Sequence, residues 1–134
     1  MRVLILCTGN SCRSQMAHGF FKSFIRDIEV HSAGTKPAER VNPKAIEVMK
    51  EVGIDLSSHR PKSVEIYLND AWDYVITVCG GANESCPNFI DKVGKRLHFG
   101  FDDPSDATGT DEFVMKEFRR VRDEIQAKFK DIFL

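Results

Sequence analysis

Short apolar runs alternate along the chain with longer segments in which apolar residues recur every three to four positions. Residues 2–7 form a β-branched and aliphatic run that is apolar on both faces, which is typical of an interior parallel strand, and further strands are predicted over 28–32, 72–79 and, more weakly, 97–101. The helical spacing predicts helices over 14–26 and 111–130. A third predicted helix starts after Asn42, with Pro43 in its first turn, and stops at Gly53. Residues 57–69 are ambiguous and allow a short helix after Pro61.

This order of elements predicts an α/β fold. Strands that alternate with helices imply a four-stranded parallel sheet with helices on both sides, three layers in all, and we expect a single domain over residues 1–134. Ligands in such folds bind beyond the carboxyl ends of the strands. Four residues with polar or reactive side chains stand at or just past predicted strand ends: Cys7, Ser32, Cys79 and Asp103.

Composition narrows the class of function. Hydrophobic residues make up 42% and charged residues 29%, as in an ordinary globular protein, and 19 Lys and Arg against 20 Asp and Glu leave a net charge of -1. A nucleic-acid-binding protein usually shows a basic surplus, so we expect no nucleic-acid partner. The apolar run at residues 3–6 is too short for a signal peptide or a membrane span, so we expect a cytoplasmic protein with no membrane contact.

The strongest candidate site is the segment of residues 7–14, Cys-Thr-Gly-Asn-Ser-Cys-Arg-Ser. A strand, a tight polar turn and a helix start place several backbone N–H groups around one point, which suits a tetrahedral oxyanion. Arg13 adds a bidentate fork, the positive field favours Cys7 as a nucleophilic thiolate, and Ser14 can donate to its sulfur. The predicted oxyanion-binding residues are Thr8, Gly9, Asn10, Ser11, Cys12, Arg13 and Ser14. The alternative is a buried cysteine followed by an ordinary helix start.

Two further features have both a chemical and a structural interpretation. Asp103 before Pro104 is a common turn starter, but a carboxylic acid at a strand end can also protonate a leaving oxygen. Cys79 and Cys86 are separated by six mostly small or polar residues, which favours a redox pair over two unrelated buried thiols. Their spacing is wide for zinc, and the four histidines show no metal spacing, so we expect neither a metal nor a cofactor.

Residues 7–14 resemble the anion-binding loop of the low-molecular-weight protein tyrosine phosphatase superfamily. Within it, the sequence Cys-Thr-Gly-Asn-Ser-Cys-Arg-Ser-Gln-Met-Ala is similar to that of thioredoxin-coupled arsenate reductases. The likeness covers nearly the whole chain, because matching segments at 32–34, 41–46, 99–104 and 120–125 follow in the expected order.

The resemblance implies roles for individual residues. Cys7, Cys79 and Cys86 would act in sequence as three relay thiols, Asp103 would be the general acid, and Cys12 would be structural. It also implies arsenate or another tetrahedral oxyanion as substrate and thioredoxin as partner, and we expect a monomer. Some relatives hold potassium beside the loop with acidic side chains, but His18 and Lys62 stand at such positions here, so we expect no potassium site.

Two alternatives remain open at this point. One is a phosphatase acting on phosphotyrosine or small phosphomonoesters, although tyrosine phosphatases typically follow Asp-Pro with Tyr and this chain has Ser105. The other is a non-enzymatic module that binds oxyanions or senses redox state through its thiols.

Overall fold

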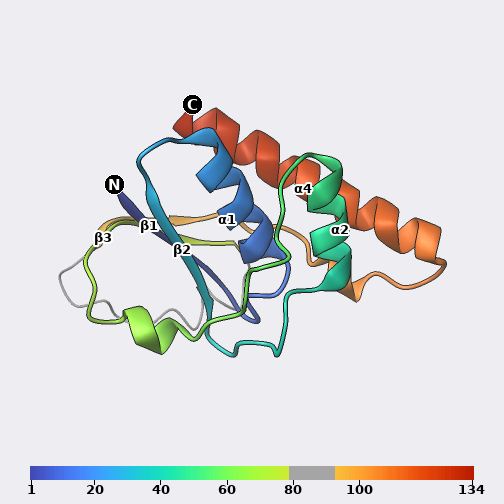
Figure 1. The fold of residues 1–134 in the computed structure, drawn as a ribbon, viewed down its shortest axis with the longest axis horizontal. Helices are drawn as coiled ribbons and strands as arrows, with labels where there is room; N and C mark the ends of the chain where they lie inside the picture. The colour runs from blue at the N-terminus through green and yellow to red at the C-terminus, as the bar shows by residue number, and fades with distance from the viewer. Residues whose placement is uncertain (79–92) are drawn as a thin grey trace.

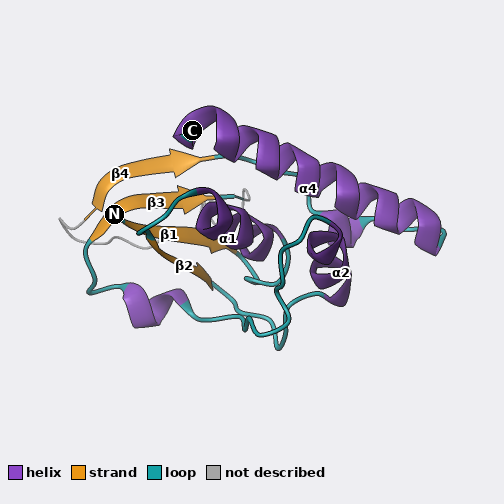
Figure 2. Cartoon of the chain, turned by 45° about the horizontal axis from the view of Figure 1, so that its top comes forward, coloured by secondary structure: helices purple, strands orange, loops and turns teal. Residues whose placement is uncertain are grey.

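The computed structural model describes residues 1–78 and 93–134. Four parallel strands form one sheet in the order β2-β1-β3-β4. The strands are β1 (Arg2–Cys7), β2 (Glu29–Gly34), β3 (Trp72–Thr77) and β4 (Val93–His98). The α-helices are α1 (Arg13–Phe24), α2 (Pro43–Glu51) and α4 (Asp111–Phe133), and two 3₁₀ helices are η1 (Val64–Tyr67) and η2 (Pro104–Asp106). Figure 1 shows this arrangement, and in Figure 2 the strand arrows point the same way. The predicted α/β class with a four-stranded parallel sheet is confirmed.

Helical segments pack on both faces of the sheet. Neighbouring residues of a strand point to opposite faces, and Ser32 and His31 of β2 show which element covers each face. Ser32 lies 2.9 Å from Nδ1 of His18 on α1, whereas the ring of His31 lies 5.2 Å from that of Tyr67 on η1. α4 joins α1 on the first face, because Phe129 contacts Phe21. The central strand β1 is therefore buried on both sides, as its continuous apolar run predicts.

The predicted bounds of the fourth strand were wrong. β4 covers Val93–His98, whereas the sequence suggested residues 97–101. It is an edge strand with exposed Gly94, Lys95 and Arg96, so it lacks the buried apolar positions by which a strand is recognised. After it, the backbone N–H groups of Phe99 and Phe101 donate to the carbonyls of Thr77 and Val78.

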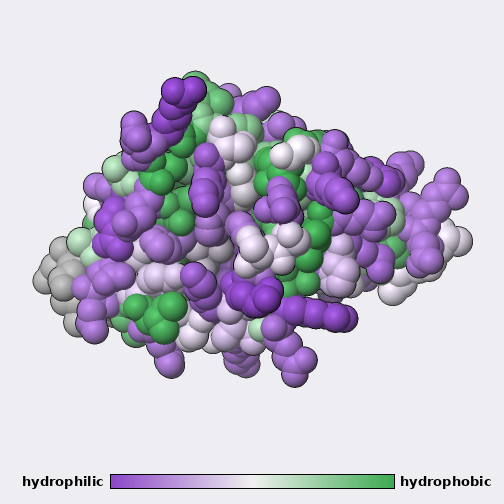
Figure 3. Space-filling view, viewed as in Figure 1, coloured by the Kyte–Doolittle hydropathy of each residue, from purple (hydrophilic) through white to green (hydrophobic). Residues whose placement is uncertain are grey.

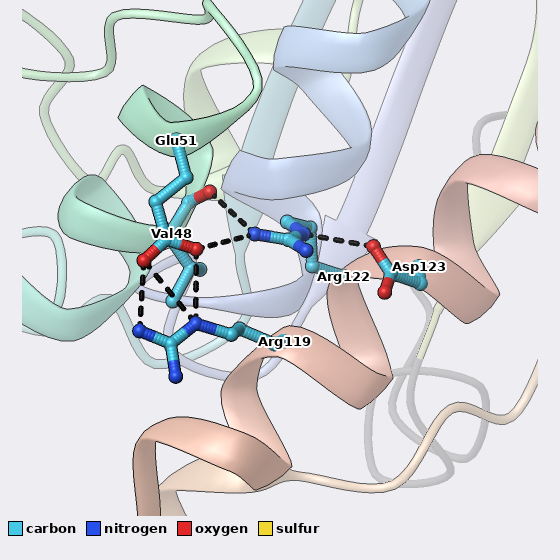
Figure 4. Close-up of polar contacts among 5 residues, drawn as sticks. All are labelled: Val48, Glu51, Arg119, Arg122 and Asp123. Carbon is cyan, nitrogen blue, oxygen red and sulfur yellow. Dashed lines mark hydrogen bonds and ion pairs between the residues drawn. The ribbon is translucent and has the colours of Figure 1, made fainter. Parts of the chain in front are cut away.

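α2 packs on the other helices and is tied to α4 by charged side chains. Its start follows the predicted signals, since the Asn42 side chain accepts from the backbone N–H of Lys44 and Pro43 opens the first turn. At its other end, Arg122 of α4 donates to the carbonyl of Val48 and to Glu51, as Figure 4 shows. Arg119 binds the same carboxylate with two of its nitrogens. α2 is thus fixed at its carboxyl end by two arginines from one helix.

The face in Figure 3 is mostly hydrophilic, with hydrophobic residues in separate patches. Among the described residues, no helix combines the length and apolar character needed to cross a bilayer.

Candidate functional site

The turn between β1 and α1 has its carbonyl groups bound on one side. The carbonyls of Cys7, Thr8, Gly9 and Ser11 accept hydrogen bonds from backbone N–H groups in the segment of residues 35–42, at 2.8–3.3 Å. In a trans peptide the N–H points opposite to the carbonyl of the same peptide unit. The N–H groups that follow these carbonyls are therefore directed away from that segment. Successive N–H groups turned to one side form an anion-binding nest.

Asn10 holds the shape of this turn from inside the protein. It is fully buried, and its φ of 51° lies in the left-handed region that Asn tolerates. Its side chain donates to Oγ of Ser14 and accepts from the Lys62 backbone N–H and from Nε2 of Gln15. The positive φ of this turn lies at Asn10 and not at Gly9.

Gly34, at the end of β2, allows the turn to lie directly against the sheet. A Cβ at this position would lie 2.4 Å from the carbonyl oxygen of Thr8, far inside van der Waals contact. Only a glycine accommodates so close an approach of two backbones.

Residues from the turn, from α2 and from η2 line one pocket of about 140 Å³. These are Cys7, Gly9, Ser11, Cys12, Arg13, Asn42, Asp103 and Ser105. The structure therefore brings Cys7, Arg13 and Asp103 together, as expected. Asn10 and Ser14 are fully buried behind the turn, and Ser14 accepts from Asn10 in a way that leaves its own O–H able to donate. Their expected roles are thus indirect.

The two terminal nitrogens of the Arg13 guanidinium have partners among the described residues, whereas its Nε has none. Its Nη1 donates to the carbonyl of Phe101 and its Nη2 lies 3.3 Å from Oδ2 of Asp103. Its Nε is buried and, within the part of the chain that the structure describes, has no hydrogen-bond partner. A buried donor without a partner costs free energy, and an anion in the pocket would remove that cost.

Asp103 is both a helix cap and a pocket residue. Its Oδ1 accepts from the backbone N–H and the hydroxyl of Ser105 at the start of η2, so the turn interpretation is correct. Its Oδ2 meets Arg13 in the pocket, so the catalytic interpretation keeps its geometric basis. The preceding Asp102 instead pairs with Arg120 on α4.

The two described cysteines differ in their surroundings. Both are buried, and both line the pocket. Burial, reinforced by the negative charge of Asp103, raises the pKa of the Cys12 thiol, and Arg13 offsets only part of this effect. Cys12 therefore stays protonated, which agrees with a structural role. The proposed relay residues Cys79 and Cys86 lie outside the described residues.

Some site residues gave no signal in the sequence. Asn42 and Ser105 line the pocket, although Asn42 was predicted only as a helix cap. Ser32 lies within β2, not past its end, and belongs with His18 to a second cavity. Across residues 1–78 and 93–134, no group of three His, Cys, Asp or Glu side chains is placed to hold a metal ion.

Known proteins share this sequence and this fold over nearly their whole length. The family model described as low molecular weight phosphotyrosine protein phosphatase matches residues 2–133. An arsenate reductase of Shouchella clausii (strain KSM-K16) is 50% identical over 129 residues, covering 96% of this chain and 91% of that protein. A solved arsenate reductase in the phosphate binding state superposes with a TM-score of 0.83 at 34% identity, covering 98% and 95%. A low molecular weight protein tyrosine phosphatase from T. tengcongensis superposes with a TM-score of 0.76 at 32% identity, covering 98% and 97%. The chain thus belongs to the low molecular weight phosphotyrosine protein phosphatase family, in which it is similar to the arsenate reductases.

Proposed function

We propose that this protein reduces arsenate to arsenite with Cys7 as nucleophile and that thioredoxin supplies the electrons. The observation that carries the proposal is the Nε of Arg13, which is buried and has no hydrogen-bond partner among the described residues, on a side chain that lines the same pocket as Cys7. An anion bound beside the Cys7 sulfur would give this buried nitrogen a partner. The similarity to arsenate reductases favours arsenate as that anion.

In the first step, the turn N–H groups and Arg13 hold arsenate next to Cys7. The Cys7 thiolate attacks the arsenic atom, a sulfur–arsenic bond forms and one oxygen leaves. Asp103, which contacts Arg13 at the pocket, donates the proton that lets this oxygen depart as water. The fixed N–H groups and the guanidinium stabilise the negative charge throughout.

The second step reduces the arsenic. The Cys79 thiolate attacks the Cys7 sulfur, the sulfur–arsenic bond breaks and its electron pair stays on arsenic, which leaves as arsenite. The two thiols have then lost two electrons and form a Cys7–Cys79 disulfide. Cys86 attacks Cys79 and releases the Cys7 thiolate, and thioredoxin reduces the resulting Cys79–Cys86 disulfide. Because thioredoxin is kept reduced there, we place the protein in the cytoplasm, and we propose that it acts as a monomer.

Pocket size favours an inorganic oxyanion over a phosphotyrosine side chain. The described residues enclose about 140 Å³, whereas pockets for larger organic ligands span roughly 300–1,000 Å³. Ser105 also offers no aromatic ring to a phenyl group. Hydrolysis of small phosphomonoesters remains the second candidate, because Cys7, Arg13 and Asp103 are the groups that such hydrolysis needs.

The test is NADPH oxidation coupled to arsenite production through thioredoxin and its reductase. We expect turnover in the wild type and none in Cys7→Ser, Cys79→Ser or Cys86→Ser. Hydrolysis of an activated aryl phosphate should survive in Cys79→Ser and Cys86→Ser and vanish only in Cys7→Ser. Parallel loss of both activities in all three variants would contradict the division between anion site and relay.

Non-reducing peptide mapping after arsenate treatment without thioredoxin tests the order of the relay. The wild type should carry Cys79–Cys86, and Cys86→Ser should stop at Cys7–Cys79 after releasing one arsenite. Cys79→Ser should release none. A Cys7–Cys12 disulfide as the main wild-type product, with Cys79 and Cys86 still reduced, would overturn the relay.

A further inference from the structure

A second cavity, of about 360 Å³, lies beside the anion turn between α1, β2 and residues 58–62. It shares no lining residue with the pocket of Cys7. The side chains that matter are Lys22, Arg60, Lys62, His18, His59 and Ser32. This cavity is therefore a separate place at which a ligand could bind.

The charged side chains that line this cavity are basic. Lys22, Arg60 and Lys62 are basic, and no Asp or Glu is among the described residues that line the cavity. The carboxylates nearest in sequence are already engaged: Asp55 accepts from the backbone N–H of Ser57, and Glu29 pairs with Arg2 and with His31, which lines the cavity. Three cations that share one cavity without a carboxylate repel one another, and an anion between them would relieve this repulsion.

The hydrogen bonds of Gln15 determine which nitrogen of His59 carries a proton. The amide nitrogen of Gln15 donates to the backbone and side-chain oxygens of Asn10 and to the carbonyl of Arg60. Its Oε1 is therefore the atom that faces Nδ1 of His59, at 3.0 Å, and Nδ1 must be the donor. In neutral His59 the other nitrogen, Nε2, then presents a lone pair, which would repel an anion.

Two of the histidines that line the cavity, His18 and His59, have lowered pKa values, which favours their neutral forms. Burial, followed by His59 and Lys22, lowers the pKa of His18 to about 3. Burial and the charges of Lys22 and Lys62 also lower the pKa of His59, against an opposing effect of Asp55. The rings lie 4.9 Å apart, and His31, paired with Glu29, also lines the cavity. Within the described chain, neither His18 nor His59 makes a hydrogen bond through Nε2.

We propose that this cavity is a second binding site for a small, multiply charged oxyanion, such as sulfate or phosphate, and that His59 takes up a proton at Nε2 when the anion binds. The proton comes from solvent and converts the repelling lone pair into a donor. Lys22, Lys62 and Arg60 supply the remaining positive charge. The site does not depend on the chemistry at Cys7.

The same contacts connect this site to the anion turn. A protonated His59 still donates through Nδ1 to Gln15, and a charged donor makes a stronger hydrogen bond. Gln15 in turn holds Asn10, on which the turn is built. Occupancy of the second site should therefore stabilise the turn that holds the first.

The test is an NMR titration of the histidine side chains with sulfate at pH 6.5 and constant ionic strength. His59 and His18 should show a saturable response in the wild type. They should keep it in Arg13→Gln, which weakens the pocket of Cys7. In the double variant Lys22→Met/Lys62→Met, sulfate affinity should fall at least about tenfold. The matched control, Lys116→Met/Lys128→Met, removes the same charge from exposed positions of α4 and should bind as the wild type does.

Calorimetry in two buffers of different ionisation enthalpy counts the protons taken up. Sulfate affinity should increase as the pH falls from 7.5 to 5.5, by up to about tenfold per pH unit, the limit for one proton. No saturable histidine response in the wild type, a response that Arg13→Gln abolishes, or binding without proton uptake would each overturn the proposal. Because two of these outcomes are read on the wild type, the proposal stays testable even if the double lysine variant does not fold.

Discussion

Asn10 combines a backbone conformation that few residues adopt with a side chain that three neighbours use. Its φ is 51°, and its amide group bonds Ser14, Gln15 and the backbone of Lys62. These contributions can be separated, because glycine adopts a positive φ freely while alanine does not. Both substitutions remove the side-chain hydrogen bonds.

We therefore expect Asn10→Ala to lower the free energy of unfolding by about 3–5 kcal/mol, from lost buried hydrogen bonds and left-handed strain together. Asn10→Gly should cost about 1–2 kcal/mol less, because only the hydrogen bonds are lost. Urea unfolding of both variants measures the difference. Equal losses would mean that the φ at this position carries no strain.

At Arg13 the shape of the charged group matters as well as its charge. One end of the guanidinium binds Phe101 and Asp103, and the buried Nε has no partner in the described chain. A lysine at this position supplies a charge but cannot form both sets of contacts at once.

Arg13→Lys should therefore lower kcat/KM for arsenate by about 100-fold or more, which corresponds to roughly two charge-assisted hydrogen bonds. Arg26→Lys, at an exposed position after α1, is the control and should leave the value unchanged. The NADPH-coupled assay at low arsenate measures both variants. Near-normal turnover in Arg13→Lys would show that the site has been wrongly assigned.

At the scale of elements, strands and helices with a buried apolar side were predictable and polar ones were not. β1 was predicted correctly because both its faces are buried and its sequence is continuously apolar. The start of α2 was predictable because Asn42 and Pro43 act locally. The edge strand β4 was misplaced, since its pairing with β3 uses backbone groups that any sequence provides.

The contact between α2 and α4 depends on one buried arginine. Arg122 donates to the carbonyl of Val48, and both Arg122 and Arg119 hold Glu51, as Figure 4 shows. The hydrogen bonds from Arg119, together with those from Arg122, lower the pKa of Glu51 to about 2. The opposite end of α2 brings Asn42 to the anion pocket, so this anchor also positions a pocket residue.

Arg122→Met should lower the free energy of unfolding by about 2–4 kcal/mol, because it leaves the Val48 carbonyl without this donor and weakens the hold on Glu51. Arg120→Met is the comparison. Arg120 makes three ion pairs, but all are at the surface, and such pairs contribute about 0–1 kcal/mol each at most. Urea unfolding of both variants tests the ranking. A larger loss in Arg120→Met would reverse it.

At the scale of the whole molecule, the site is assembled from segments far apart in the chain. The turn motif and Asp103 could be predicted because each has a local sequence pattern. The contributions of Lys62 and Ser105 could not, because they arise only when the turn meets residues about 50 to 90 positions away. The net charge of -1 likewise gave no indication of the cavity lined by basic side chains beside the turn.

Two buried or paired groups make stability depend on pH in two different ranges. The pKa of Glu51 is about 2 in the folded protein against 4.5 in an unfolded chain, so its contribution is lost as the pH falls from about 4.5 toward 2. The pKa of His18 is about 3 against 6.5, and between these values only the unfolded chain binds the proton. Protonation then stabilises the unfolded state, and stability falls as the pH drops below about 6.5. At pH 5 the loss of stability through His18 has therefore set in, while the stabilisation by Glu51 is still intact.

His18→Gln should remove this dependence. Between pH 7.5 and 5.0 the wild type should lose about 2 kcal/mol of unfolding free energy through His18, and the variant should lose that much less. Ser32→Ala is the matched control, because it deletes the hydrogen-bond partner of His18 but keeps the imidazole. It should lower stability at both pH values and show the same pH-dependent drop as the wild type. Urea unfolding in chloride buffers at the two pH values gives all three drops. If His18→Gln lost as much as the wild type, His18 would already carry its proton in the folded protein, and the neutral cavity from which we infer a second anion site would need another explanation.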